Sequence, residues 1–374
     1  MTLIKPEHVY KNVKSASRIP LNLMKLEIFN IILILDINVR NNMMSKIIES
    51  LEQKLNIILI YKYEGGEPQT SHLNLFLKRI HNFSFDAIIG IGGGSTLDFT
   101  KAASVLCKKG FDVDSGNYQG VNFEVDKKVI CVCIPTTAGS GAETTKSAVM
   151  FNPNTNIKRG INHLKVLPDI VFLIPSILDN LPEGVFYPSL FDGVTHAFES
   201  LVGKSSTKQT SRLAKKSLRI YRKQLNRRYL KDKYHKKVLL ASHFAGQAIC
   251  NSETGPIHAL SYPFSEFLKM SHGQAVSLVL PRVISFYNYY NNELIEPLLK
   301  NLGFYQVNSL VDKIDLLNSK FILPNINVRK DIDVNSFVLR SMELQGAINN
   351  SPIKWSKDYS LKIYNEIFES LAIN

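Results

Sequence analysis

The chain has 374 residues, more than a single hydrophobic core usually holds, so its length predicts two domains. Hydrophobic residues make up 45% of it, and the apolar runs are strand-sized, so we expect neither a membrane span nor a secretory signal peptide. Four cysteines, two of them within one apolar run, predict reduced thiols and a cytoplasmic protein.

The formal net charge of +13 comes from one segment. Residues 204–237 contain fourteen Lys and Arg against a single acid, Asp232, and the rest of the chain is balanced. Apolar residues recur there at helical spacing: Ala214, Leu218, Tyr221 and Leu225. This pattern predicts a surface helix with a solvated basic face. A funnel for anionic substrates and a nucleic-acid patch are the alternatives, but without a nucleic-acid-binding motif we expect no specific nucleic-acid partner.

Strand-like and helix-like runs alternate from the N-terminus to about residue 175. The predicted strands are continuous apolar runs at 28–36, 56–63, 86–92, 128–136 and 169–174. The predicted helices between them cover 41–55, 70–83 and 96–107, and a polar loop follows residue 136. This alternation is typical of a parallel sheet covered by helices on both faces.

No strand is predicted after Pro175, and helical patterns continue to the C-terminus. The segment IPSILDNLPEG at 174–184 combines prolines with a glycine, so we expect the domain boundary there. The sequence therefore predicts an α/β domain over residues 1–175 and an all-helical domain over residues 176–374.

A glycine-rich turn connects the third predicted strand to the following helix. It consists of Gly92, Gly93, Gly94 and Ser95. Glycines let a phosphate approach the backbone closely, and the start of a helix offers unpaired N–H groups and a partial positive charge. Ser95 stands where the dinucleotide fingerprint has its third glycine, so a tight turn without a ligand is the alternative.

A second loop, PTTAGSGAETT at Pro135–Thr145, follows another apolar strand and is dense in glycine and small hydroxyl residues. At the carboxyl end of a parallel strand such a loop can bind phosphate, ribose or amide groups. An ordinary polar loop is the alternative.

One carboxylate and three imidazoles form the third pattern: Asp192, His196, His258 and His272. Asp192 and His196 are four residues apart and share one face of a helix. His258 and His272 would be about 21 Å apart along one helix, so we expect Pro263 to break or bend it. This ligand set suits Fe²⁺ or Zn²⁺.

Four segments resemble, in order and spacing, the motifs of the iron-containing alcohol dehydrogenase family. GGGSTLDFTK is similar to the family's GGGSxxDxxK, PTTAGSGAETT to its PTTAGTGSE, and DGVTHAFES to its DAxTHAxE. GPIHALSYP and the later SHG are similar to its GxxHAxxHP and PHG, and the likeness runs from about residue 30 to beyond Asn350. It implies a dinucleotide-binding α/β domain, a helical domain, and an active site in the cleft between them.

The resemblance also implies residue roles. The metal ligands, which are also the catalytic centre, would be Asp192, His196, His258 and His272. The cofactor contacts would be Asp36, Gly92, Gly93, Gly94, Ser95, Asp98, Thr136, Thr137 and Lys158. The Asp36 carboxylate, at the end of a predicted strand, would repel a 2′-phosphate, which favours NAD over the alternative NADP.

Three departures from the family pattern indicate a divergent branch. Tyr262 stands where the family often has a second histidine near the substrate, and a phenol with a pKa of about 10 is a poorer base. Ile174 and Leu190 replace an aspartate and a glycine. We expect Tyr262 at the catalytic centre of a metal-dependent, NAD(P)-linked dehydrogenase or reductase. Its substrate would be a small alcohol or aldehyde, including anionic ones related to phosphonoacetaldehyde or acidic sugars.

Two other functions fit parts of the sequence. A sugar-phosphate cyclase or dehydroquinate synthase would share the architecture and use NAD transiently, but such enzymes usually bind metal through a glutamate and two histidines. A non-catalytic protein could bind partners through the basic segment. Net NADH formation separates a dehydrogenase from the first, and steeply salt-dependent nucleic-acid binding without metal would indicate the second. We also expect a homodimer, the commonest oligomer.

Overall fold

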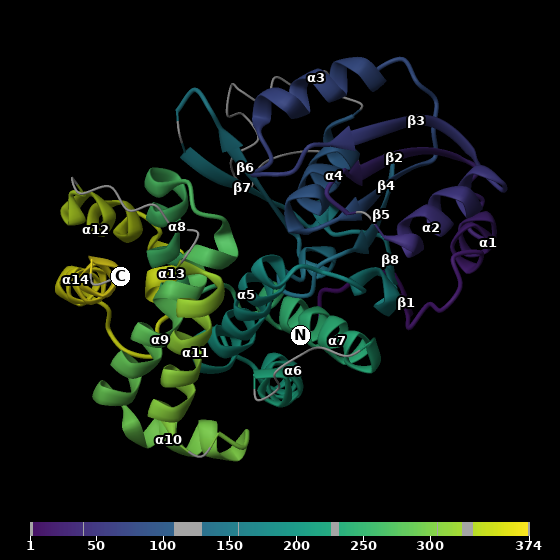
Figure 1. Cartoon of the computed structure of the whole chain (residues 1–374). Helices are drawn as coiled ribbons and strands as arrows, with labels where there is room; N and C mark the ends of the chain where they lie inside the picture. The colour runs from purple at the N-terminus through teal and green to yellow at the C-terminus, as the bar shows by residue number, and fades with distance from the viewer. Residues whose placement is uncertain are drawn as a thin grey trace. The chain divides into compact units, whose positions relative to one another are not determined.

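A computed structural model describes residues 3–39, 41–107, 129–155, 157–225, 232–304, 306–323 and 332–372 (Figure 1). The chain forms two compact units. The first comprises Met1–Leu181 and Lys231–His243, and the second comprises Pro182–Leu230 and Phe244–Asn374. A helical segment from the C-terminal half of the sequence therefore groups with the first unit.

The first unit is built on a six-stranded sheet in which every neighbouring pair is parallel. In spatial order its strands are β1 (His8–Lys11), β8 (Ile170–Leu173), β5 (Ile130–Pro135), β4 (Ala87–Gly92), β2 (Asn30–Asp36) and β3 (Asn56–Tyr63). Every residue of β4 is buried, as expected for a strand covered on both faces. This explains why the central strands are continuous apolar runs.

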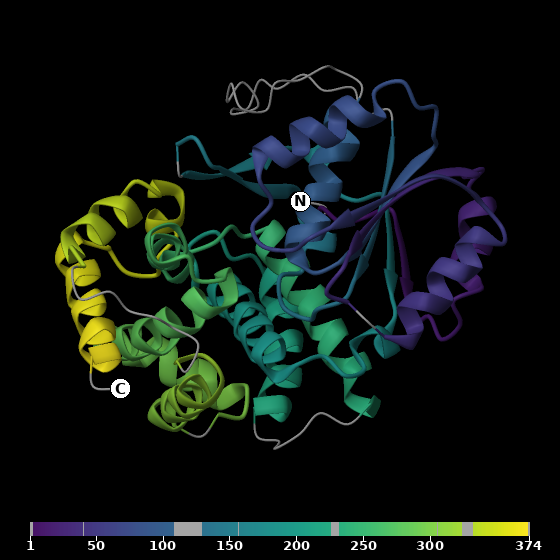
Figure 2. The same cartoon turned by 45° about the horizontal axis from the view of Figure 1, so that its top comes forward.

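Helices cover both faces of this sheet. They are α1 (Arg18–Met24), α2 (Asn42–Glu52), α3 (Thr70–Ile80) and α4 (Gly94–Leu106). Figure 2 shows α3 and α4 on one face and α1 and α2 on the other. The buried rings of Phe76 on α3 and Phe99 on α4 lie 5.4 Å apart in the core of the first face. Burying each ring stabilises this layer by about 1.5–3 kcal/mol.

The segment predicted as a polar loop after residue 136 contains an antiparallel hairpin, so that part of the prediction was wrong. Its strands are β6 (Ser147–Asn152) and β7 (Ile157–Asn162), and a short 3₁₀ helix, η2 (Ala142–Thr144), precedes them. Further short helices are η3 (Leu164–Val166) and η4 (Pro175–Leu178). The hairpin depends on tertiary packing, because Ala148 and Met150 of β6 are buried in the same core as α4.

The second unit is helical throughout the part that the structure describes. Its helices are α5 (Glu183–Val202), α6 (Lys208–Leu225), α8 (Pro256–Leu268), α9 (His272–Tyr290), α10 (Asn292–Asn301), α11 (Val307–Phe321), α12 (Val334–Met342), α13 (Gln345–Asn349) and α14 (Lys357–Ala372). The helix α7 (Asp232–Cys250) is divided between the two units at His243. The predicted fold class, a parallel α/β sheet followed by a helical region, is confirmed.

Two glycines next to predicted ligands let the helices of the second unit approach closely. A Cβ on Gly193 would lie 2.1 Å from the hydroxyl of Tyr221 on α6. A Cβ on Gly273 would lie 2.6 Å from the carbonyl oxygen of Pro188 on α5. Larger residues would push α6 and α9 away from α5, so these glycines fix the helix spacing on which the site depends. Among the described helices, none is both long and apolar enough to span a bilayer.

Candidate metal and cofactor sites

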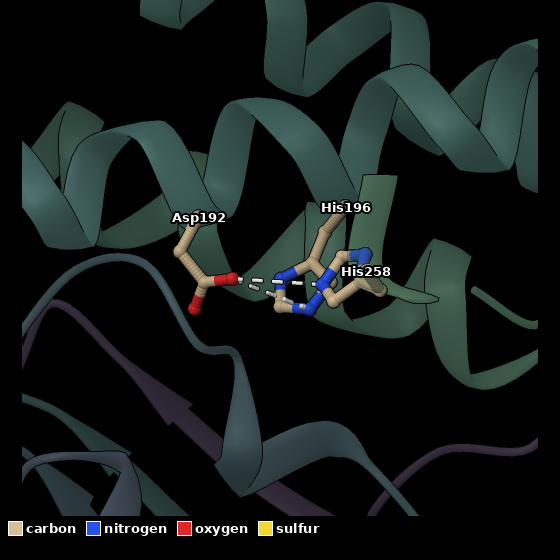
Figure 3. A group of neighbouring side chains, drawn as sticks. All are labelled: Asp192, His196 and His258. Carbon is tan, nitrogen blue, oxygen red and sulfur yellow. Dashed lines mark ion pairs between the residues drawn. The ribbon is translucent and has the colours of Figure 1, made fainter. Parts of the chain in front are cut away.

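The four predicted ligands converge within the second unit. Asp192 and His196 lie one turn apart on α5, His258 lies on the first turn of α8, and His272 begins α9. The Nε2 atoms of His196 and His258 are each 3.7 Å from Oδ1 of Asp192, and Nε2 of His272 is 3.4 Å from the same oxygen. Figure 3 shows the side chains of Asp192, His196 and His258 pointing toward one another.

These spacings fit a shared divalent cation. They exceed ordinary hydrogen-bond lengths, whereas two ligands bound tetrahedrally at about 2.1 Å from one ion lie about 3.4 Å apart. Among the described residues, neither Oδ1 of Asp192 nor Nε2 of His258 has a hydrogen-bond partner, although both atoms are buried. Buried polar atoms without partners are costly, and a bound cation would satisfy both.

His272 is less tightly integrated than the other three residues. The donor atoms of Asp192, His196 and His258 all lie within 4.8 Å of one another, and His272 stands outside that group. Its side chain is 36% exposed, while the other three are buried. The structure thus provides a buried three-residue core with a fourth, more accessible imidazole beside it.

Charge coupling within the cluster is strong. Burial raises the pKa of Asp192, but the charges of His196 and His272 outweigh it and hold that pKa well below its ordinary value. Burial lowers the pKa of His196 to about 4 against the attraction of Asp192. Burial also lowers the pKa of His258, but Glu199 and Asp192 outweigh it and bring the pKa to about 9. The site therefore favours positive charge beside His258, which a cation can supply in place of a proton.

Sequence reasoning missed Glu199. Its Oε2 lies 2.6 Å from Nδ1 of His258, and the side chain is buried. A signal was available, because Glu199 follows Asp192 by seven residues and His196 by three, which places all three on one face of α5.

Tyr262 lies one turn beyond His258 on α8, half-buried, with its ring centroid 6.2 Å from that of His272. Pro263 was expected to break or bend this helix, and it does not break it, because α8 continues to Leu268. The chain reverses after Lys269, which has a left-handed backbone (φ 57°), and Ser271 then caps α9. A proline can remain within a helix when neighbouring packing compensates for the lost hydrogen bond.

The glycine turn lies where the strand order of the sheet reverses. The chain leaves β2 toward β3 on one side and leaves β4 toward β5 on the other, and ligands of open α/β sheets bind at such switch points. Asp36 ends β2, and Gly92 ends β4. A Cβ on Gly92 would lie 2.5 Å from Thr96, and one on Gly94 would lie 2.9 Å from Ser140, so this turn accepts no larger residues without rearrangement.

The loop after β5 packs against this turn. The backbone N–H of Thr136 donates to the carbonyl of Gly92 at 2.9 Å, and a Cβ on Gly93 would lie 3.4 Å from Thr137. Oγ1 of Thr136 is buried and has no hydrogen-bond partner among the described residues. Ser95 lies in the first turn of α4, where N–H groups lack partners within the helix. The structure thus joins the two predicted cofactor segments.

Asp98 and Lys158 make structural contacts. Asp98 accepts a hydrogen bond from the backbone N–H of Val149 at 2.9 Å and pairs with Lys101 at 2.8 Å, tying α4 to the hairpin. Burial raises the pKa of Asp98 although Lys101 opposes it. Lys158 on β7 pairs with Glu67 at 2.7 Å. Asp36 accepts from the backbone N–H of Asn38 at 2.9 Å.

The basic segment is a surface helix where it is described. α6 buries Ala214, Leu218, Tyr221 and Leu225 and exposes Lys208, Arg212, Lys216, Arg219 and Lys223. Residues 226–231 of the segment lie outside the described residues.

A parallel sheet with a glycine turn at its switch point, together with a helical unit holding a buried Asp–His cluster, has the features of a metal-dependent dehydrogenase. Comparison with known families agrees. Two family models match this chain. The model for iron-containing alcohol dehydrogenase matches residues 6–175, and the model for the C-terminal part of the Fe-containing alcohol dehydrogenase family matches residues 188–368. The chain belongs to the iron-containing alcohol dehydrogenase family, and it is an oxidoreductase acting on CH–OH groups.

Individual relatives are more distant. The chain is 28% identical over 329 residues to sulfoacetaldehyde reductase of Bilophila wadsworthia (strain 3_1_6), covering 83% of this chain and 84% of that protein. It is 25% identical over 335 residues to 4-hydroxybutyrate dehydrogenase of Clostridium kluyveri, covering 86% and 89%. Sulfoacetaldehyde reductase from Bifidobacterium kashiwanohense, solved in complex with NAD⁺, shares the fold with a TM-score of 0.85 at 18% identity over 98% of each chain.

Proposed function

We propose that this enzyme interconverts a small anionic alcohol and its aldehyde with NAD and a divalent metal. The observation that carries the proposal is the buried convergence of Asp192, His196 and His258. An anionic substrate is supported by two relatives whose names specify a sulfonate and a carboxylate substrate. NAD is supported by the complex of the sulfoacetaldehyde reductase with the same fold.

Each predicted site residue has a place in this proposal. The metal ligands are Asp192, His196, His258 and His272. The residues on the cofactor side are Asp36, Gly92, Gly93, Gly94, Ser95, Asp98, Thr136, Thr137 and Lys158. When bound, the metal supplies Lewis acidity toward the substrate oxygen, and the nicotinamide exchanges a hydride with the substrate carbon.

The protein's own groups bind and orient these partners. N–H groups at the start of α4 neutralise the pyrophosphate, and the hydroxyl of Thr136 offers a hydrogen bond beside it. Asp36 accepts hydrogen bonds from the adenosine ribose and disfavours a 2′-phosphate, so NAD is preferred to NADP. Asp98 and Lys158 keep the hairpin in place behind the turn.

Tyr262 is the proposed determinant of substrate choice near the metal. It stands where the family often has a histidine, and a phenol hydroxyl donates a hydrogen bond to an oxyanion of the substrate. Histidine is the side chain best suited to exchanging a proton near neutral pH. The replacement therefore shifts this position from proton relay toward binding.

The proposal also covers the organisation of the chain. We assign cofactor binding to residues 1–175 and metal and substrate binding to residues 176–374. A cytoplasmic location is supported by four buried cysteines that are not joined in disulfides. A homodimer is proposed as the assembly, and gel filtration with light scattering tests it.

A substrate panel tests the function. Neutral and anionic aldehydes of matched length are compared by NADH absorbance, with Fe²⁺ or Zn²⁺ added back. We expect kcat/KM to be at least about tenfold higher for the anionic members. Tyr262→His should reduce that preference while retaining bound metal. Equal rates for neutral and anionic substrates would contradict the anionic proposal, and substrate turnover without net NADH change would indicate the cyclase alternative.

A further inference from the structure

The carboxylate of Glu199 is surrounded by hydrogen-bond donors. Its Oε2 accepts from Nδ1 of His258 at 2.6 Å and from the backbone N–H of Gly255 at 2.7 Å. Its Oε1 accepts from the backbone N–H of Ile257 at 2.6 Å. A Cβ on Gly255 would lie 2.9 Å from Oε1, so the chain approaches this closely only because residue 255 is glycine.

We propose that Glu199 is a positioning residue that fixes the tautomer of His258 and thereby sets metal affinity. The inference rests on the metal site proposed above. A neutral imidazole has one donor nitrogen and one acceptor nitrogen. An ionised carboxylate can only accept, so Nδ1 of His258 carries the proton. Nε2 then keeps its lone pair, and this is the atom that faces Asp192.

Only a group with two acceptor oxygens satisfies all of these donors. A glutamine at position 199 would direct an NH₂ toward His258 Nδ1 or toward the N–H groups that begin α8. In the first case Nδ1 must accept, Nε2 carries the proton, and the ligand is lost. In the second case a donor faces a donor, and the first turn of α8, which carries His258, shifts.

The surrounding loop does not depend on Glu199 alone. Asn350 holds it independently, since its Nδ2 donates to the carbonyl oxygens of Ser252 and Thr254, each at 3.0 Å. The side chain of Asn350 also accepts from the N–H of Ser205 at 2.9 Å. We therefore expect Glu199→Gln to fold and to lose metal affinity selectively.

Metal affinity is the decisive measurement. The full-length protein is stripped with a chelator, reloaded with Zn²⁺, and titrated by chelator competition. Glu199→Gln should weaken affinity by about 10- to 100-fold, as expected when the outer partner of a metal-bound histidine is removed. Glu199→Asp, which keeps both oxygens but shortens the side chain, should restore part of the loss. The visible spectrum of the Co²⁺-loaded protein should change in Glu199→Gln.

Glu266 provides the matched control. Like Glu199, it is a buried carboxylate. It lies on α8 and pairs with Arg340 at 2.7 Å. Glu266→Gln should lower thermal stability while leaving metal affinity and the Co²⁺ spectrum unchanged. Affinity in Glu199→Gln equal to the parent, or an equal loss in Glu266→Gln, would overturn the inference. If Glu199→Gln does not fold, parental affinity in Glu199→Asp overturns it. Retention of metal by His258→Ala would instead overturn the metal site itself.

Discussion

The proposed metal site and the proposed cofactor site are built in opposite ways. In the second unit the site consists of charged and ionisable side chains, Asp192, His196, His258 and Glu199, enclosed by helices. In the first unit the site depends on missing side chains, because Gly92 and Gly94 leave space that a Cβ would fill. The metal site should therefore respond to charge and pH, and the cofactor site to side-chain volume.

The largest effect should come from removing a central ligand. His258→Ala leaves Asp192 and Glu199 facing each other without a cation or an imidazole between them. We expect it to lose most bound metal and to lower kcat/KM by about a thousandfold, because Lewis-acid stabilisation is worth several kcal/mol. Metal per chain and circular dichroism check this. Full activity, or a lost fold, would contradict it.

The second-largest effect should come from acidification, which should lower the affinity for the metal. Protons compete with the cation for imidazole nitrogens, so affinity falls as pH decreases, by up to about tenfold per unit for each proton displaced. Because the pKa of His258 is about 9, protons compete with the cation for this imidazole throughout the neutral range. The pKa of His196 is about 4, so protons compete for that imidazole only in acid. Chelator competition across this range measures it. Affinity that does not vary with pH would show that these nitrogens do not bind the metal.

In the cofactor site, added side-chain volume should have the largest effect. In Gly92→Ala the added methyl would lie 2.5 Å from Thr96, so α4 must shift. We expect a loss of about 1–3 kcal/mol in the free energy of unfolding and a rise in the KM for NAD of about tenfold, with metal content unchanged.

A second glycine supplies the control for this substitution. A Cβ on Gly184, at the start of α5, would meet nothing within 4 Å. Gly184→Ala should change stability by less than about 1 kcal/mol, in the favourable direction, and leave the KM for NAD unchanged. Denaturant unfolding and steady-state kinetics compare the two variants. Equal behaviour of both would refute the steric argument.

The smallest effect should come from the basic face of α6. Arg212 and Arg219 are exposed, and at physiological salt their fields are screened beyond about 8 Å. The double variant with glutamine at both positions should keep kcat/KM for an anionic aldehyde within about twofold. A loss exceeding about tenfold at low salt that disappears at high salt would show that this face steers substrate.

Prediction from sequence succeeded where a residue's role is local. The apolar runs of β2, β4 and β5 identified buried parallel strands, and the glycines of the turn identified a strand-to-helix junction. It failed for the hairpin of β6 and β7, which packs against α4, an element far from it in the chain. It also misplaced the reversal after α8, which follows the left-handed residue Lys269 and not Pro263.

The amino-acid sequence alone was sufficient for the fold class and the family, because periodicity and motif spacing are properties of the chain itself. Only the tertiary structure decided that Glu199 accepts a hydrogen bond from His258, that Asp98 holds the hairpin through the N–H of Val149, and that His272 is more exposed than Asp192, His196 and His258. Hydrogen bonds between groups fifty or more residues apart depend on how helices pack. No local pattern encodes that packing, so these contacts appear only once the chain has folded.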